Sequence, residues 1–596
     1  MSATRTATLG AVHRVTLGEG AVRLSLPDSG HDWHVFALAP GMTAAGAAAT
    51  RVDVNLDASY VDVRLETADG APHGAAEEVT VLILKQGFHA LDDGTQMTVD
   101  RDTTWGVGGE TVVHRQFTLP MGEAPLIFGQ VGEVTSYAHD PLFDRGYHPV
   151  RFQDVGPERM WIGAAGPEAQ LWDGNGRAEI SYFILSGGTG GGTLGDIAWR
   201  SGSADTAADG TLSVEFGAAF DDPGALAQIS SNYGHDPVTA RTASVSATGA
   251  AFAMLEDQTR DAETAHLPET IDWMALDGTG ALTVEQPRVI ETGIVSVDSN
   301  GMEITFSSSF DTPVVFAMVN SRNGTDVVMA QASAVEAGGF HLALREPDAL
   351  DGWHGVETVA WMAVEAGRWM LGDMLIEAGL TTSGGPTVGA GWDRVDFSGG
   401  GFVNHHEASS VRVLANTQTV NGPAFTQTVT GGVGEDGFSF ALQEEMAVAD
   451  GWHAPETVGW LAVQTVGNTA HDRDPMWAGG FDVGVIGPGG ERDVDSRFLN
   501  DFSAGGLSDA QHGAFVQRAS FNGPGGMLAQ VTGFDYESGR VDYGGGHYGA
   551  FYEYGTVTAD FRADPSMGPD AGHAVAESFD YIGIGEPGEH YGYAWL

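Results

Sequence analysis

The chain has 596 residues, with 80 acidic and 27 basic side chains and a formal net charge of −53 at pH 7. A field of this sign repels phosphate groups, so nucleic acid and anionic membrane are poor partners. The chain contains no cysteine, which excludes disulfides, thiolate metal sites and cysteine nucleophiles. No stretch approaches the roughly 18 apolar residues of a transmembrane segment.

Two segments in the N-terminal third introduce a pattern that recurs along the chain. The first, PHGAAEEVTVLIL, contains His73 and Glu78, and the second, WDGNGRAEISYFIL, contains Glu179 and Tyr182 but no histidine. Apolar and polar residues alternate after the glutamate, which is typical of a half-buried strand. We interpret both segments as degraded copies of a repeated unit.

Four clearer copies follow, which read AHLPETIDWMAL, DGWHGVETVAWMAV, DGWHAPETVGWLAV and GHAVAESFDYIGIG. Each places a histidine three or four residues before a glutamate, and an alternating apolar strand comes next. Because the similarity extends upstream of each glutamate, we interpret the copies as one module repeated six times. The four clear pairs are His266 and Glu269, His354 and Glu357, His453 and Glu456, and His573 and Glu577.

The segments between these copies contain further short strands and Gly-rich turn signals, and no helical periodicity of any length. The predicted fold class is therefore all-β, with six tandem small antiparallel β-sandwich units of about six strands each. Glycine-rich stretches such as Ser186–Gly195 and Thr381–Gly391 suggest flexible connectors between units. The predicted units span residues 1–90, 110–197, 207–285, 292–378, 393–476 and 494–596, and the first two are divergent.

The fourth unit has a strand that opens with Pro and Val, and the fifth unit has a counterpart of this strand. Both units then have a Gly-Phe strand, a Trp-His pair and a final strand with tryptophan. In this order they resemble the H-type lectin domain of snail agglutinins and discoidins. The resemblance implies a six-stranded sandwich, carbohydrate binding by these two units, and association in threes, as in two intrachain pseudo-trimers. The chain departs from the family at its glutamates, and the family's sugar-contacting residues cannot be matched one by one. The matching residues are Pro313, Val314, Val315, Gly339, Phe340, Trp353, His354 and Trp361 in the fourth unit, and Gly437, Phe438, Trp452, His453 and Trp460 in the fifth.

Three interpretations of the His-Glu signature remain open. In the first it is structural, because the carboxylate accepts backbone N–H bonds from an incoming loop and pairs with the imidazole. In the second it belongs to a metal site, for which carboxylate oxygens favour calcium over zinc. In the third it lines a pocket where a tryptophan stacks on a sugar and polar groups bond its hydroxyls. The candidate metal ligands are Glu346, Asp348, Glu444 and Glu445, and the candidate pocket residues are Asp351, Trp353, His354, Asp450, Trp452 and His453.

The functional prediction follows from the repetition. No nucleophile elbow or H-E-x-x-H motif occurs, and the recurrent residues are shared among units, so we expect a binding protein and not an enzyme. The prediction is a multivalent carbohydrate-binding, adhesive protein at the cell surface or in the extracellular space, exported without an N-terminal signal peptide. Its expected partners are glycans or cell-surface polysaccharide, with self-association through the repeats, and calcium is a possible cofactor. A structural surface, filament or phage-like component is the first alternative, and a polysaccharide-acting enzyme is the second.

Overall fold

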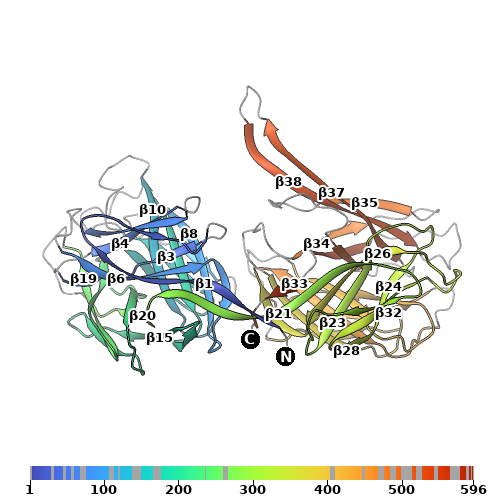
Figure 1. Ribbon diagram of the computed structural model, residues 1–596, viewed down its shortest axis with the longest axis horizontal. Helices are drawn as coiled ribbons and strands as arrows, with labels where there is room; N and C mark the ends of the chain where they lie inside the picture. Colours follow the sequence, from blue (N-terminus) through green and yellow to red (C-terminus); the bar gives the residue numbers. More distant parts are fainter. Residues whose placement is uncertain are drawn as a thin grey trace. The chain divides into compact units, whose positions relative to one another are not determined.

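The computed structural model of the chain is all-β, and the residues that it describes form no helix (Figure 1). None of those residues therefore belongs to a helix long and apolar enough to cross a membrane. Contacts divide the chain into an N-terminal unit, Thr6–Glu285, and a C-terminal unit, Gln286–Leu596 with Met1–Arg5. The structure describes residues 3–28, 33–43, 48–55, 59–67, 75–105, 113–117, 121–136, 149–165, 176–234, 236–258, 266–372, 374–388, 390–399, 401–402, 410–445, 450–466, 476–483, 491–497, 513–518, 527–542, 548–563, 577–584, 589–591 and 593–594.

The N-terminal unit contains three modules of six strands each. Module 1 consists of β1 (Thr4–Leu17), β2 (Val22–Ser25), β3 (Trp33–Phe36), β4 (Ala48–Asn55), β5 (Tyr60–Thr67) and β6 (Glu77–Lys85). Module 2 consists of β8 (Gln96–Trp105), β9 (Val113–Gln116), β10 (Leu126–Ser136), β11 (Val150–Gln153), β12 (Arg159–Ala164) and β13 (Gly176–Leu185). Module 3 consists of β15 (Ile197–Asp205), β16 (Thr211–Glu215), β17 (Pro223–Ile229), β18 (Val238–Ser246), β19 (Gly249–Glu256) and β20 (Thr270–Asp277).

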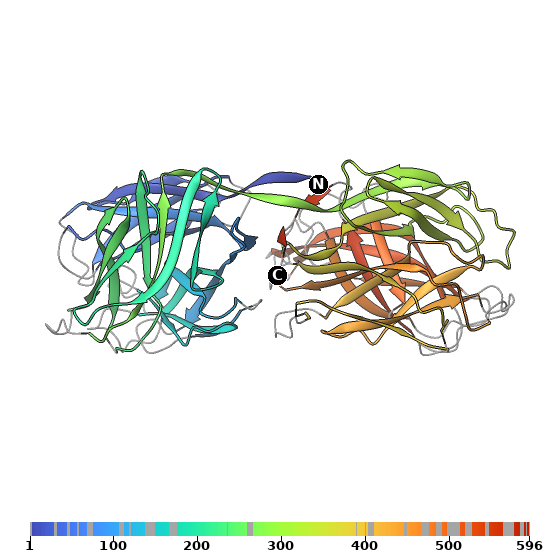
Figure 2. The same ribbon diagram turned by 90° about the horizontal axis from the view of Figure 1, so that it is seen from below.

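The C-terminal unit contains the other three modules, which are coloured from green to red in Figure 2. Module 4 consists of β21 (Gly280–Val297), β22 (Met302–Thr305), β23 (Pro313–Val319), β24 (Met329–Glu336), β25 (Gly339–Arg345) and β26 (Glu357–Glu365). Module 5 consists of β28 (Met374–Thr382), β29 (Asp393–Asp396), β30 (Arg412–Thr417), β31 (Thr426–Gly431), β32 (Gly437–Glu444) and β33 (Thr457–Thr465). Module 6 consists of β34 (Met476–Val483), β35 (Glu491–Arg497), β36 (Gly513–Arg518), β37 (Met527–Asp542), β38 (Tyr548–Ala563) and β39 (Glu577–Ile584).

All six modules share one strand topology. In module 4, one sheet has the order β23-β26-β21 and the other has the order β22-β25-β24, and every pairing is antiparallel. The other five modules repeat this order, with the sixth strand at the centre of one sheet and the fifth at the centre of the other. This repetition confirms the predicted fold class of tandem small β-sandwiches.

The sixth strand of module 4 is buried on both of its faces. Val359, Trp361 and Ala363 pack in the core of their own sandwich. The alternate residues, such as Met362, join a second core that includes Leu461 of module 5 and buried side chains of module 6. Because side chains of a strand alternate between its faces, one apolar run serves two cores. The three modules of this unit therefore share a common core, in keeping with the predicted grouping of the modules in threes.

Aromatic side chains join modules 1 and 2 within the N-terminal unit. Phe128 and Phe183 stack with ring centroids 4.4 Å apart, and Phe36 of module 1 meets Phe183 edge-on at 4.8 Å. These fully buried rings belong to the third and sixth strands, so the sheets that contain the sixth strands face one another here as well.

The strand pairings differ from the predicted unit boundaries by about one strand. The first strands of modules 2, 3, 5 and 6 all lie before the predicted starts at residues 110, 207, 393 and 494. They follow the preceding module so closely that no break in composition marks them. The additional strands β7 (Gly87–Ala90), β14 (Thr189–Leu194) and β27 (Gly367–Leu371) pair with the first strands of the modules that follow them.

Two glycine-rich stretches have other roles than the predicted connectors. Most of Ser186–Gly195 forms β14, which pairs with β15 in register. Thr381–Gly391 lies inside module 5, where it begins with the last two residues of β28 and precedes β29. Near the C-terminus, β40 (Glu589–Tyr591) pairs with β21 and β41 (Tyr593–Ala594) pairs with β27, so the end of the chain completes sheets of modules 4 and 5.

Candidate functional site: the loops held by the recurring glutamate

The recurring glutamate of module 4, Glu357, is the first residue of β26 and is fully buried. Its carboxylate accepts the backbone N–H groups of Asn323, at 2.7 Å, and Gly324, at 2.8 Å, and the Ser321 hydroxyl at 2.5 Å. The Ser321 hydroxyl in turn accepts the N–H of Thr358 at 2.7 Å. The carboxylate thus holds the loop between β23 and β24 against the sixth strand. We call this arrangement the glutamate clamp.

A histidine extends the clamp to the loop between β25 and β26. The ring of His354 lies between two carboxylates, with Nδ1 2.9 Å from Glu346 and Nε2 3.0 Å from Glu357. Both ring nitrogens therefore face a carboxylate oxygen. A methyl group on Gly324 would lie 2.6 Å from this ring, so the close approach requires glycine. His354 is itself buried.

The hydrogen bonds lower the pKa of Glu357 below its ordinary value of 4.5. Burial acts in the opposite direction, because it penalises the charged form. The bonds from Ser321, Asn323, Gly324 and His354 together outweigh burial. The folded module therefore favours the ionised glutamate.

Module 5 repeats the clamp with one conservative change. Glu456 accepts the N–H groups of Asn421, at 2.6 Å, and Gly422, at 3.1 Å, and the hydroxyl of Thr419 in place of a serine. The ring of His453 lies 3.1 Å from Glu444 and 3.2 Å from Glu456. The sequence repeat of 99 positions between Glu357 and Glu456 therefore corresponds to a repeat of side-chain contacts.

In module 3 the glutamate is in place but the histidine bonds elsewhere. Glu269 accepts the N–H groups of Tyr233, at 2.7 Å, and Gly234, at 2.9 Å. The ring nitrogens of His266 lie 2.9 Å from the carbonyl oxygen of Leu267 and 3.3 Å from that of Asp236. The closest ring nitrogen of His266 is 3.8 Å from Glu269, so this histidine pairs only weakly with the carboxylate.

The register of the sixth strands corrects the assignment of the glutamate in modules 1 and 2. In module 1 the clamp residue is Glu77 and not Glu78, because Glu77 is fully buried and accepts the N–H of Thr43 at 2.8 Å. The buried Arg241 of module 3, 3.1 Å from Glu77, takes the place of a histidine. In module 2 the equivalent position, four residues before Tyr182, is an alanine, so Glu179 is not a clamp residue. In module 6, His573 lies outside the described residues, and Glu577 is the first residue of β39.

The acidic residues predicted as calcium ligands are engaged with the protein. Glu346 accepts the N–H of Gly352 at 3.1 Å, in addition to its contact with His354. Asp348 accepts the N–H of Phe425 of module 5 at 2.9 Å, and Glu445 of module 5 accepts the N–H of Ala349 at 3.1 Å. These bonds join the loops of modules 4 and 5. Within the described ranges no group of three or more His, Asp and Glu is arranged to hold a metal ion, and a calcium site stays a prediction.

The two tryptophans of the Trp-His pairs point away from the buried clamp. Trp353 is 53% exposed and Trp452 is 55% exposed, whereas the adjacent histidines are buried. In each loop the aspartate two residues earlier, Asp351 or Asp450, accepts the backbone N–H of the tryptophan at 3.0 Å. Six of the ten exposed large apolar side chains in the described part of the chain lie in clamp loops, namely Tyr233, Leu267, Trp353, Val356, Val420 and Trp452.

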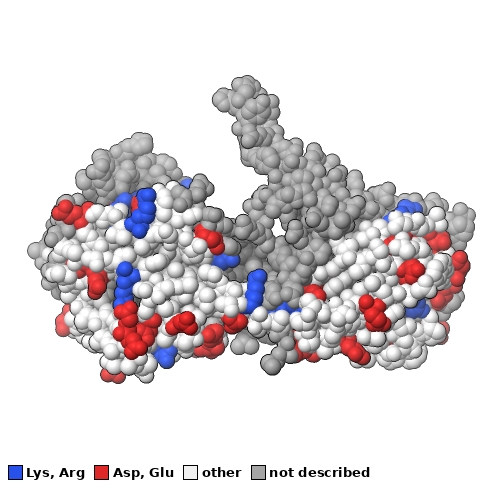
Figure 3. All heavy atoms as spheres, viewed as in Figure 1, with Lys and Arg blue, Asp and Glu red and all other residues white. Residues whose placement is uncertain are grey.

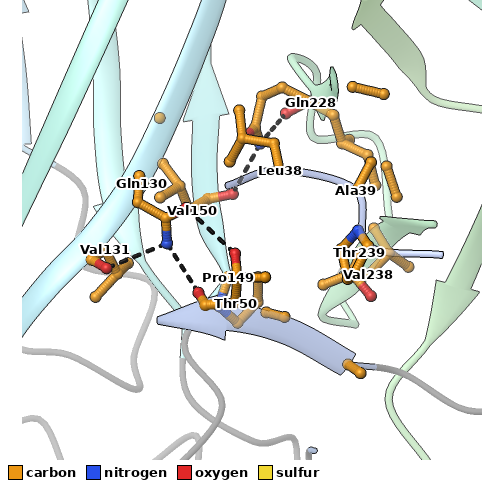
Figure 4. Close-up of a pocket in the computed structure, with 17 residues that line it drawn as sticks. Leu38, Ala39, Thr50, Gln130, Val131, Pro149, Val150, Gln228, Val238 and Thr239 are labelled. Atoms are coloured by element: carbon orange, nitrogen blue, oxygen red, sulfur yellow. Dashed lines mark hydrogen bonds between the residues drawn. The ribbon is translucent and has the colours of Figure 1, made fainter. Parts of the chain in front are cut away.

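A cavity of about 50 Å³ lies where the three modules of the N-terminal unit meet (Figure 4). Its polar lining comes from Thr50, Gln130, Gln228 and Thr239, and no charged side chain lines it. The Gln130 amide donates to the carbonyl oxygen of Thr50 at 2.8 Å, whereas the buried Thr239 hydroxyl has no partner among the described residues. The polar lining of this cavity suits ordered water molecules.

Comparison with known proteins gives one partial match. No protein-family model matches the chain. Over 188 residues the chain is 23% identical to halomucin from Haloquadratum walsbyi, a match that covers 31% of this chain and 2% of halomucin. The chain therefore spans a very small part of the length of that relative. No solved structure matches.

Proposed function

We propose that the chain is a multivalent carbohydrate-binding or adhesive protein that acts outside the cell, and that the clamp loops of modules 4 and 5 bind the glycan. The observation that carries this proposal is the pair of exposed indoles, Trp353 and Trp452, at equivalent positions of two loops that are anchored by buried hydrogen bonds. In this proposal the glutamates and histidines of the clamp are structural, and the exposed tryptophans and aspartates contact the ligand.

The physical argument rests on exposure and rigidity. An indole that is more than half exposed offers an apolar face to the C–H groups of a sugar ring, and a nearby carboxylate can accept bonds from its hydroxyls. The turn that presents each tryptophan is already fixed by the bond from its N–H to Asp351 or Asp450, so little conformational freedom is lost on binding. The histidines use both ring nitrogens within the clamp, so they support the loop and leave sugar contact to its exposed residues.

Three further observations support this proposal. Each module is a sandwich of six strands, the number that the resemblance to H-type lectins implies. A part of the chain is similar to a protein named as a mucin, which is compatible with a location outside the cell. Two sites on one chain also allow both to engage one polysaccharide, and such avidity can exceed the affinity of one site by orders of magnitude.

A structural role as a surface or filament component is the second candidate, favoured by the shared core of modules 4, 5 and 6. In that case the exposed tryptophans would bury against other copies of the chain. Light scattering of the purified protein distinguishes the two, because self-association through these loops would be lost in the double variant Trp353→Ala/Trp452→Ala.

A glycan-array screen tests the proposed function. The wild type should bind a defined set of glycans, the double variant Trp353→Ala/Trp452→Ala should lose binding at least tenfold, and Trp392→Ala should retain it. Trp392 is a matched control, because it is also exposed but lies outside the clamp loops. The screen is run with and without chelator, so that a calcium requirement is seen as chelator-sensitive binding. A folded wild type that binds no glycan would refute the proposal.

A further inference from the structure

The charged side chains around the exposed tryptophans are mostly acidic. In module 5 the two clamp loops, residues 418–425 and 445–456, contain Glu445, Asp450 and Glu456 and no lysine or arginine, and Glu444 ends the strand before the second loop. One cation approaches from module 4, where the guanidinium of Arg345 donates to the carbonyl oxygen of Pro423 at 2.5 Å. In Figure 3 acidic side chains outnumber basic ones over the visible described surface, in agreement with the net charge of −53.

Each exposed tryptophan has a carboxylate two residues before it, which is bonded to its backbone N–H. Asp351 and Asp450 are exposed, and one oxygen of each accepts the tryptophan N–H in the same turn. The structure gives the second oxygen of either carboxylate no partner among the described residues. An ammonium group gains from both elements, because the face of an indole attracts cations and a carboxylate pairs with them.

The number of available carboxylates favours an organic cation over a metal ion at these turns. Calcium requires six to eight oxygen ligands, whereas each turn offers a single free carboxylate. One oxygen of each neighbouring carboxylate, Glu346 and Glu444, is bonded to histidine, and Oε2 of the buried Glu444 has no partner among the described residues. A sugar that carries a protonated amine can use the indole face and the carboxylate at the same time.

We propose that the clamp loops of modules 4 and 5 select glycans that bear protonated amines, such as glucosamine polymers, over their neutral N-acetylated counterparts and over anionic glycans. This inference rests on the proposed function, because it names the class of glycan that the same loops take. A surface cation–π contact and an exposed ion pair together correspond to a preference of about tenfold. The preference is electrostatic, so it should shrink as salt is added.

Binding to glucosamine oligomers and to N-acetylglucosamine oligomers of equal length tests the inference, with the full chain immobilised and the pH kept below the pKa of the sugar amine. The wild type should bind the amine form about tenfold more tightly. In the double variant Asp351→Asn/Asp450→Asn the preference should fall to about threefold, because asparagine keeps the acceptor for the tryptophan backbone N–H and removes the ion pair, while the cation–π contact with the indole remains. The double variant Glu303→Gln/Glu336→Gln is the control, since it removes the same charge from exposed positions of module 4 outside the clamp loops.

The outcomes separate this inference from the function on which it rests. If the wild type binds the two oligomers equally, and this binding depends on the tryptophans, the amine preference is wrong. The proposed glycan binding is then still supported. An amine preference that is undiminished in the Asp351→Asn/Asp450→Asn variant would also overturn the inference, because the net charge of the chain would then be the cause. If neither oligomer nor any other glycan binds, the proposed function itself fails.

Discussion

Replacing Glu357 by glutamine should destabilise the C-terminal unit without changing ligand affinity. The substitution keeps the size of the side chain but leaves one acceptor oxygen where there were two. If that oxygen still accepts the N–H groups of Asn323 and Gly324, the new amide nitrogen, which is a donor, faces the Ser321 hydroxyl. The oxygen of this hydroxyl already accepts the N–H of Thr358. A hydrogen bond to a charged group contributes about 1.5–3 kcal/mol, so we expect a loss of about 2 kcal/mol in the free energy of unfolding.

The same bonds predict a pH dependence. Because the folded-state pKa of Glu357 lies below 4.5, the folded module binds fewer protons at this site than the unfolded chain. The contribution of the clamp is therefore complete above about pH 5 and is lost as the pH falls through the folded-state pKa. In Glu357→Gln this part of the acid sensitivity should be absent.

Urea denaturation and hydrogen exchange of the full chain provide the assay. The unfolding midpoint of the C-terminal unit should fall in Glu357→Gln, and the amides of residues 321–324 should exchange faster. Glu303→Gln, an exposed substitution in the same module, should change the stability by less than about 0.5 kcal/mol. If Glu357→Gln is as stable as this control and the amides keep their protection, the clamp does not hold the loop and the reasoning fails.

Four further results are expected. Burial raises the pKa of Asp272 from 3.8 to about 6, so stability should fall as the pH rises between these values, and Asp272→Asn should recover up to about 3 kcal/mol above pH 7, as measured by urea midpoints. Thr239→Val should stabilise the N-terminal unit by about 1 kcal/mol, because the buried hydroxyl has no partner among the described residues, and a loss in calorimetry would instead reveal a bound water. Gly422→Ala should destabilise module 5 by about 1–3 kcal/mol in urea, since the new methyl group meets the ring of His453. Adding salt should raise the melting temperature, because it screens the repulsion among 53 net negative charges, and a flat response would contradict this.

The sequence predicted the fold class because alternation and repetition are local signals. The strand Gly339–Arg345 alternates apolar and other residues, as it alternates buried and half-buried positions in the structure, and the 99-residue spacing of Glu357 and Glu456 matches the modular repeat. The module boundaries could not be found in this way. The first strand of module 2, Gln96–Trp105, belongs by hydrogen bonding to a sixth strand about 80 residues later, and no local pattern reports such pairing.

The candidate site was predictable in its residues but not in its contacts. The motif grouped Trp353 with His354, yet the structure exposes the first and buries the second between two carboxylates. Alternation could not reveal this difference, because both residues lie in a loop. Glu77 was missed in favour of its neighbour Glu78, because module 1 has an aliphatic residue and no tryptophan four positions after either glutamate, so only burial separates the two.

The most direct test of the account is the stoichiometry of glycan binding, measured by isothermal titration calorimetry with a glycan identified on the array. The account predicts two sites per chain for the wild type, one site for either Trp353→Ala or Trp452→Ala, and none for the double variant, with the fold unchanged in each. A stoichiometry that is the same in all four proteins would contradict the claim that the repeated clamp presents two equivalent recognition loops.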